Sequence, residues 1–167
     1  MKIETNSLME SYLNQAKYSF ENIDTVLPEE LNKLLTSGFR IEQECILYKD
    51  FQYFGPGELN SDFQKCEYEI FLNDIHIDDY VKNVESELEY LKLGFRFAKK
   101  LQNELKIRFT DRFRIIISFS ETAYSGQEIE TYGGCVVNFY KIRPSSDEKF
   151  KVANLEGFEE EAVMVIE

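Results

Sequence analysis

The stretch Leu155-Glu-Gly-Phe-Glu-Glu-Glu-Ala-Val-Met-Val-Ile-Glu167 constrains the architecture of this chain more than any other. Acids crowd its first half, and five consecutive apolar residues follow, from Ala162 to Ile166. Successive side chains of a strand point to opposite faces of a sheet, so a strand that is apolar at every position needs both faces covered. We therefore expect 162–166 to be an inner strand. The glutamates before it should then lie at the end of the sheet, where water or a partner can reach them.

Alternation of polar and apolar residues predicts the other strands. Pro and Gly in Gly55-Pro56-Gly57 suit a type II turn, so we interpret the segments on either side of it as a hairpin with one wet face. A polar loop, residues 121–131, separates the two later strands. The four predicted strands cover residues 39–54, 65–72, 113–119 and 132–142.

Helical spacing of apolar residues predicts three helices. Ser7-Leu-Met-Glu10 resembles a capping box and begins a helix over 7–21, and a short helix runs from Pro28 to Gly38. The longest helix covers about 80–106 and is capped by Asp78 or Asp79. Together these elements predict one α+β domain, residues 1–167, in which an antiparallel sheet of about five strands packs against one long helix, with two N-terminal helices.

Size and composition favour a cytoplasmic globular protein. The chain has 167 residues, of which 43% are hydrophobic, and no apolar run approaches the roughly 20 residues of a membrane span. The polar start Met1-Lys-Ile-Glu lacks the apolar core of a signal peptide. The three cysteines are odd in number and far apart, so we expect reduced, buried thiols in a reducing compartment.

The formal net charge of -12 is distributed unevenly. Residues 40–79 carry ten acids against three bases, residues 80–114 carry nine bases against five acids, and residues 147–167 carry seven acids against two bases. The helix dipole explains most of the basic zone, because the bases fall late in the long helix. An anionic ligand could bind to Arg108, Arg112 and Arg114. The preferred interpretation is that these arginines form ion pairs with the acids of residues 40–79. Neither nucleic acid nor an anionic membrane is an expected partner.

Catalytic motifs are weak in this sequence. Asp74, His76 and Asp78 would share one face of an extended segment and form a conceivable metal cluster, although protein metal sites usually show more His or Cys at tighter spacing. His76 is the only histidine, and no nucleophile elbow or phosphate loop is present. Gly133-Gly134 within a strand pattern indicates a bulge or a close backbone approach. We therefore predict a protein that is not an enzyme, with no catalytic residues, metal or cofactor.

Binding to a basic protein is the favoured function. Clustered acids steer a cationic partner, and exposed aromatic side chains supply binding energy. An ordinary acidic surface kept for solubility explains the same residues equally well. The predicted interface includes Tyr124 and Tyr132 beside the polar loop, a second acidic group of Asp74, Asp78 and Asp79, and the C-terminal group of Glu156, Phe158, Glu159, Glu160 and Glu161.

The block Tyr132-Gly-Gly-Cys-Val-Val-Asn-Phe-Tyr-Lys-Ile-Arg-Pro144, together with residues 155–167, resembles small bacterial immunity proteins of contact-dependent growth inhibition systems. That resemblance implies a cytoplasmic antidote that binds and neutralises a cognate toxin domain, often a nuclease with a basic substrate groove. Two other functions stay open from the residues alone. One is a small metal-dependent enzyme centred on His76, and the other is a homo-oligomeric regulatory or structural protein; the sequence does not define the oligomeric state.

Overall fold

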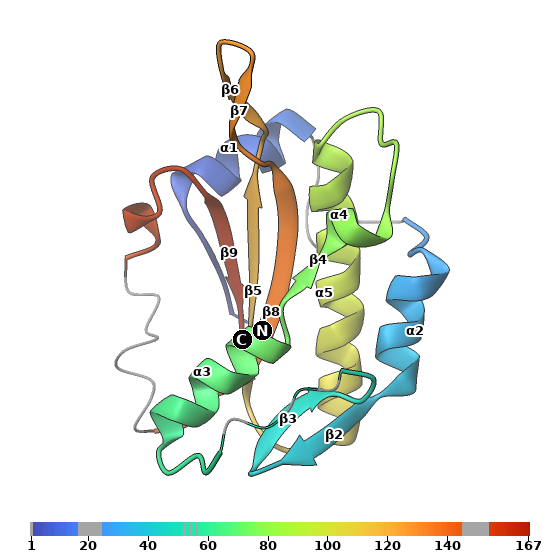
Figure 1. Cartoon of the computed structure of the whole chain (residues 1–167), viewed down its shortest axis with the longest axis vertical. Coiled ribbons are helices and arrows are strands. Elements are labelled where there is room, and N and C mark those ends of the chain that lie inside the picture. Colours follow the sequence, from blue (N-terminus) through green and yellow to red (C-terminus); the bar gives the residue numbers. More distant parts are fainter. Residues whose placement is uncertain (1, 17–24, 52, 54, 56, 145–153) are drawn as a thin grey trace.

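The computed structural model describes residues 2–16, 25–51, 53, 55, 57–144 and 154–167 (Figure 1). Its centre is a five-stranded sheet in which every neighbouring pair is antiparallel. The predicted α+β class, the five-stranded sheet, the long helix and the two N-terminal helices are all confirmed. In spatial order the strands are β1 (Ile3–Thr5), β9 (Ala162–Ile166), β5 (Phe113–Ser120), β8 (Gly134–Lys141) and β4 (Ile75–His76).

Strand β9 lies inside the sheet, between β1 and β5, as its apolar run predicts. All five of its residues are buried. Ala162, Met164 and Ile166 face the main core, whereas Val163 and Val165 pack with Leu155 on the opposite face of the sheet. Leu155 belongs to a short 3-10 helix, η2 (Leu155–Gly157), so the segment before β9 supplies the second cover that the strand needs.

Helix α5 (Leu88–Arg108) packs across β5 and β8 and forms one wall of the main core (Figure 1). A Cβ at Gly94 would overlap Cys135 Sγ, so this glycine sets how closely the helix approaches the sheet. The predicted start of this helix near residue 80 is wrong. Asp78 and Asp79 lie instead in a separate short helix, α4 (Ile77–Tyr80). The backbone between α4 and α5 is not helical at Asn83, whose φ is 60°.

The two N-terminal helices differ in how well their ends were predicted. Helix α2 (Glu29–Ser37) follows Pro28 and ends at Gly38, whose φ is 84°, as expected. Helix α1 (Ser7–Ala16) begins at the predicted residue but with a different cap: Asn6 Oδ1 accepts from the Met9 amide at 2.9 Å. The predicted Ser7 cap is therefore wrong. Residues 17–21 of the predicted helix lie outside the described residues.

Residues 65–72 form a helix, not the predicted strand. The hairpin in this region pairs β2 (Phe39–Glu42) with β3 (Cys45–Tyr48), and residues 62–72 belong to α3 (Asp62–Leu72). Ser61 Oγ accepts from the Gln64 amide at 3.2 Å, and Gln64 Oε1 accepts from the Asn60 amide at 2.8 Å. This near-reciprocal cap starts a helix just before the alternating residues that suggested a strand. Pro56 of the predicted turn lies outside the described residues.

Helix α3 joins the hairpin to the sheet through buried polar side chains. Glu69 is fully buried, and its carboxylate forms a bidentate pair with Arg143 at 2.6 and 3.0 Å. The same carboxylate accepts from the backbone amides of Ile46 in β3, at 2.8 Å, and Lys141 in β8, at 3.0 Å. Every strong acceptor position of Glu69 is therefore used, which is the condition for burying a carboxylate.

A second hairpin, β6 (Ala123–Ser125) with β7 (Glu128–Thr131), extends beyond the end of the sheet (Figure 1). A Cβ at Gly133 would overlap backbone atoms of Thr122, so the predicted close backbone approach is confirmed. Cys45, Cys66 and Cys135 are buried and free, also as predicted. Among the described residues, no helix has the length and apolar character that crossing a membrane requires.

Candidate functional site

The two ends of the sheet differ in charge. Strand β5 is antiparallel to both β8 and β9, so its last residue, Ser120, lies beside the first residues of those strands. We call this the acidic end; it comprises the sheet end at Ser120, Gly134 and Ala162 with the segments that join there. The opposite end, where β5 begins at Phe113 and β8 ends at Lys141, we call the ion-paired end.

The acidic loop, residues 156–161, leads into β9 and is held by a neutral side chain. Asn6 is 1% exposed; its Nδ2 donates to the carbonyl of Glu161 at 2.7 Å and that of Phe158 at 3.3 Å. Its Oδ1 also accepts from the Val163 amide at 3.0 Å. Because Asn6 binds only backbone groups of the loop, the loop's carboxylates are left to point outward.

Glu156 has a different role from the other acids of the loop. Its Oε1 accepts from both the amide and the hydroxyl of Ser7, each at 2.8 Å, which ties η2 to the start of α1. An acid at a helix N-terminus is also favoured by the helix dipole. Glu156 is exposed, but part of its hydrogen-bonding capacity serves the fold.

The remaining loop residues surround a shallow surface hollow. It is lined by Ser120, Gly157, Phe158, Glu159, Glu160 and Glu161. The Phe158 ring is 47% exposed among these carboxylates. Five residues predicted from the sequence, Glu156 and Phe158 to Glu161, thus stand together at one end of the sheet.

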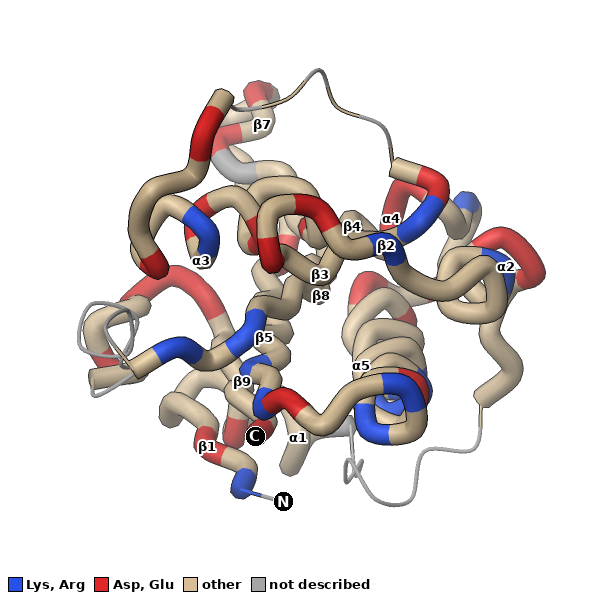
Figure 2. Tube along the Cα trace, turned by 90° about the horizontal axis from the view of Figure 1, so that it is seen from below, with Lys and Arg blue, Asp and Glu red and all other residues tan. Residues whose placement is uncertain are grey.

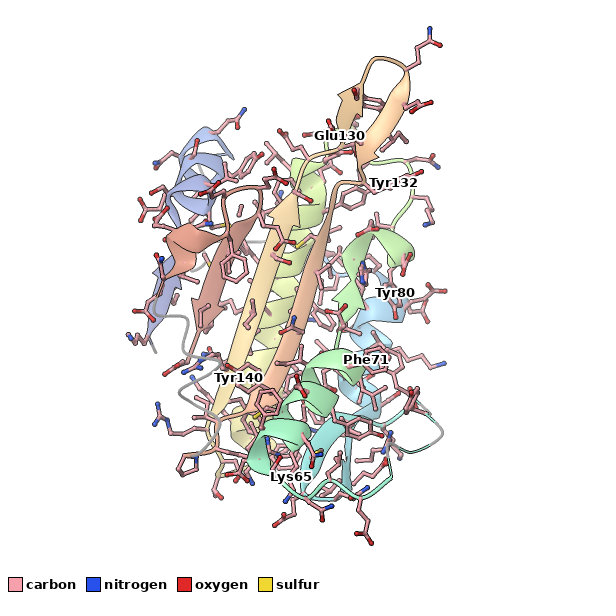
Figure 3. The ribbon with its side chains drawn as sticks, turned by 60° about the vertical axis from the view of Figure 1, so that its left-hand side comes forward. Lys65, Phe71, Tyr80, Glu130, Tyr132 and Tyr140 are labelled. Carbon is pink, nitrogen blue, oxygen red and sulfur yellow. The ribbon has the colours of Figure 1, made fainter. Side chains whose placement is uncertain are left out.

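The β6–β7 hairpin adds a second set of exposed groups to the acidic end (Figure 3). Tyr124 is 65% and Tyr132 80% exposed, so both predicted aromatics are accessible. The sequence interpretation missed Ile129, which is 40% exposed on the same hairpin, and the exposed acids Glu128 and Glu130. Tyr124 and Ile129 lie on either side of Gly126, a spacing that is compatible with a hairpin. The polar residues around them led to the prediction of a loop instead.

The three predicted aspartates do not form one group. Asp78 lies against the start of β8, since a Cβ at Gly134 would overlap its carboxylate, and Asp79 is exposed beside it in α4. Both belong to the acidic end. Asp74 is separate: its Oδ2 lies 3.2 Å from His76 Nε2, and it lines another hollow with Glu67, Ile70 and Phe71. Within the described ranges, no three His, Cys, Asp or Glu side chains are grouped as metal ligands.

Two tyrosines at the acidic end, Tyr12 and Tyr90, have raised pKa values. Burial raises the pKa of Tyr12, and the neighbouring Glu121 carboxylate, which accepts from the Tyr12 hydroxyl at 3.2 Å, raises it further. The pKa of Tyr90 is likewise raised, first by burial and then by Asp78 and Glu87. A negative neighbour opposes formation of a phenolate, so the carboxylates beside both rings add to the larger effect of burial.

At the ion-paired end, bases and acids lie next to each other, as Figure 2 shows from below. Lys65 beside Glu44 lowers the pKa of that carboxyl. Arg112 and Arg114 both pair with Glu167, so the prediction that they pair with acids of residues 40–79 is wrong, and Arg108 pairs with Glu104. Other pairs at this end are Lys2–Glu4, Arg40–Glu42, Lys65–Glu44, Lys141–Asp111 and Arg143–Glu69.

The acids of the acidic end have no such partners. In the part of the chain that the structure describes, none of these carboxylates forms an ion pair with Lys or Arg: Asp78, Asp79, Glu121, Glu128, Glu130, Glu159, Glu160 and Glu161. Eight carboxylates without a described Lys or Arg partner therefore gather at this end. They are combined there with exposed Phe158, Tyr124 and Tyr132.

These features define an α+β protein whose accessible chemistry is a set of carboxylates and aromatic rings around one end of an antiparallel sheet. The chain belongs to the uncharacterized protein PM0498 family, whose model matches residues 4–167. No curated protein and no solved structure matches it. The family match spans β1 to β9 and so includes both ends of the sheet.

Proposed function

We propose that this protein works by binding a basic protein through its acidic end, and that it is an immunity protein that neutralises a cognate toxin domain. The observation that carries the proposal is the contrast between the two ends. The carboxylates of Glu44, Asp111 and Glu167 at the ion-paired end already have intramolecular cations, whereas those at the acidic end have none among the described residues. A partner can pair with the latter without breaking an existing ion pair.

The geometry suits a protein partner better than a small ligand. The acidic loop forms a shallow hollow, and the β6–β7 hairpin extends past it, so the two present an extended, uneven surface. Acids at its rim would steer a basic partner and speed association. Phe158, Tyr124 and Tyr132 offer apolar area for the centre of the contact, where aromatic residues contribute most.

A nuclease toxin is the favoured partner class. Proteins that hold nucleic acids use clustered Lys and Arg to neutralise phosphates, and a surface of clustered carboxylates complements such a groove. The sequence resemblance to immunity proteins of contact-dependent growth inhibition supports the same assignment. Binding in this way would cover the substrate groove of the toxin.

Affinity capture from the native host, followed by kinetics on the captured partner, tests the proposal. The wild-type chain should retain a basic protein, and the triple variant Glu159→Lys, Glu160→Lys, Glu161→Lys should associate with it at least about tenfold more slowly at low salt. The control triple variant Glu29→Lys, Glu30→Lys, Glu58→Lys changes the net charge equally at exposed sites outside the acidic loop.

Loss of association in the acidic-loop variant but not in the control supports the proposal. Equal association rates for both variants would remove the acidic loop from the interface. Capture of a basic partner that is not a toxin would retain the binding surface and overturn the immunity assignment. In a growth assay with the captured toxin domain, wild type should restore growth and the acidic-loop variant should not.

A further inference from the structure

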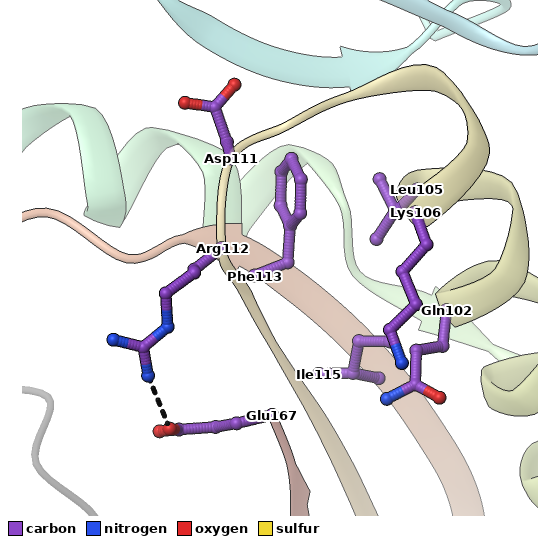
Figure 4. A pocket seen from close by; sticks show the side chains of 8 residues that line it. All are labelled: Gln102, Leu105, Lys106, Asp111, Arg112, Phe113, Ile115 and Glu167. Carbon is purple, nitrogen blue, oxygen red and sulfur yellow. Dashed lines mark hydrogen bonds and ion pairs between the residues drawn. The ribbon is translucent and has the colours of Figure 1, made fainter. Parts of the chain in front are cut away.

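A cavity of about 140 Å³ opens at the ion-paired end, between the last turns of α5, the start of β5 and Glu167 (Figure 4). Its apolar wall consists of Leu105, Phe113 and Ile115. Polar groups from Gln102, Lys106 and Arg112 surround this wall. The cavity lies at the opposite end of the sheet from the acidic loop, so its role is independent of the proposed toxin-binding surface.

Gln102 is an unusual residue for its place in the fold. It is only 8% exposed, and its amide forms no hydrogen bond within the described part of the chain. Figure 4 shows the amide directed into the cavity, beside the end of the Lys106 side chain. The amide is accessible from the cavity and forms no hydrogen bond to the described chain, so it is available to a molecule that enters the cavity.

The side chains around the cavity favour an anion. Arg112 and Arg114 share the Glu167 carboxylate, and Lys141 pairs with Asp111. Lys106 has no ion-pair partner among the described residues. The charged side chains that line the cavity are two cations, Lys106 and Arg112, and two carboxylates, Asp111 and Glu167; the ion pairs Arg112–Glu167 and Lys141–Asp111 leave Lys106 as the lining cation without a described partner. A ligand that brings one negative charge would complete the pairing.

We propose that this cavity binds a small monocarboxylate with an apolar body. The carboxylate would accept from the Lys106 ammonium and the Gln102 amide, and the apolar body would contact Leu105, Phe113 and Ile115. The apolar wall disfavours inorganic phosphate or sulfate, which would leave that surface uncovered and lose their own hydration. A small aliphatic acid of four to six carbons, on the order of the cavity volume, matches the site.

Titration of the full chain with 3-methylbutanoate, followed by amide and methyl NMR shifts, tests this site. Saturable shifts should appear at the Gln102 side-chain amide and the Ile115 methyls. The uncharged 3-methylbutanamide has the same apolar body, and it should bind at least about tenfold more weakly because it lacks the charge-assisted contact. Inorganic phosphate at equal concentration should give no saturable shift at Ile115.

Two variants locate the contacts. Lys106→Gln should weaken 3-methylbutanoate binding about tenfold, whereas Lys33→Gln, the same charge change at an exposed site of α2, should leave it unchanged. Gln102→Leu should weaken binding and retain the dispersed spectrum of the folded chain, since Leu suits a buried helical position. Absence of saturable shifts, equal binding of acid and amide, or equal effects of the two lysine changes would each overturn the proposal.

Discussion

The two ends of the sheet use carboxylates in opposite ways. At the ion-paired end the Glu69 carboxylate is fully buried and holds Arg143 and two backbone amides, so its charge is part of the fold. At the acidic end Glu159 to Glu161 are exposed and without described cationic partners, and the neutral amide of Asn6 holds their backbone. A charge that is paired inside the chain stabilises structure, whereas an unpaired cluster repels itself and is available for a partner.

The largest effect is expected at the ion-paired end. Glu69→Ala should lower the free energy of unfolding by about 3–5 kcal/mol, because Arg143 would remain buried without its partner. Urea denaturation measures the change. The double variant Glu69→Met, Arg143→Met removes both charges and should recover most of that loss. A single-variant loss no larger than that of the double variant would mean that Arg143 finds another partner or water.

Asn6→Ala should have the next largest effect. It removes the cap of α1 and the hydrogen bonds to the acidic loop, and we expect a loss of about 2 kcal/mol in the free energy of unfolding. Hydrogen exchange should speed up at the Val163 amide. Asn14→Ala, at an exposed position of the same helix, is the matched control. Unchanged exchange at Val163 would show that the loop is held by other contacts.

Neutralising the acidic loop should stabilise the protein slightly. Glu159→Gln, Glu160→Gln, Glu161→Gln relieves repulsion among carboxylates that have no described partner, so the thermal midpoint should rise a little at low ionic strength. That gain should disappear near about 1 M salt, where the screening length falls to roughly 3 Å. Glu44→Gln removes a paired carboxylate and should lower the midpoint instead. A midpoint that falls for both variants would contradict the contrast between the ends.

The smallest effect concerns tyrosine ionisation at the acidic end. The raised pKa values of Tyr12 and Tyr90 favour the neutral phenol in the folded state, so their contribution to stability is complete below the ordinary pKa, about 10, and is lost as pH rises through the raised folded values. Absorbance titration should show both phenols ionising late. Glu121→Gln should lower the Tyr12 pKa only in part, because burial is the larger cause; a return to the ordinary value would assign the shift to charge alone.

Sequence patterns predicted the parts of the fold whose apolar residues carry the pattern. The uninterrupted run of β9 required an inner strand, and Pro28 and Gly38 marked the ends of α2. The failure at α3 has a physical reason: its buried face includes Glu69 and Asn73, which no count of apolar residues assigns to a core. Their burial depends on partners in β3 and β8, far away in the sequence.

The candidate site was predicted where charge and aromatic residues are adjacent in sequence. Glu159 to Glu161 and Phe158 were found in this way, and the fold brings Tyr124 and Tyr132 to the same end. Asn6 was missed because its role depends on the pairing of β1 with β9, which a single sequence does not reveal. Asp74 was grouped with Asp78 by spacing alone, and the start of α4 separates them.

The pairing of β1 with β9 also bears on how the protein can be handled and how it forms. Lys2 and Glu167 exchange backbone hydrogen bonds of 2.9 Å, so both ends of the described chain emerge side by side, away from the acidic loop (Figure 1). A tag or surface tether at either terminus would therefore leave the acidic loop free. During synthesis, β1 cannot pair with β9 until residues 162–166 have been made. Pairing of these two strands is therefore a late, long-range step in folding.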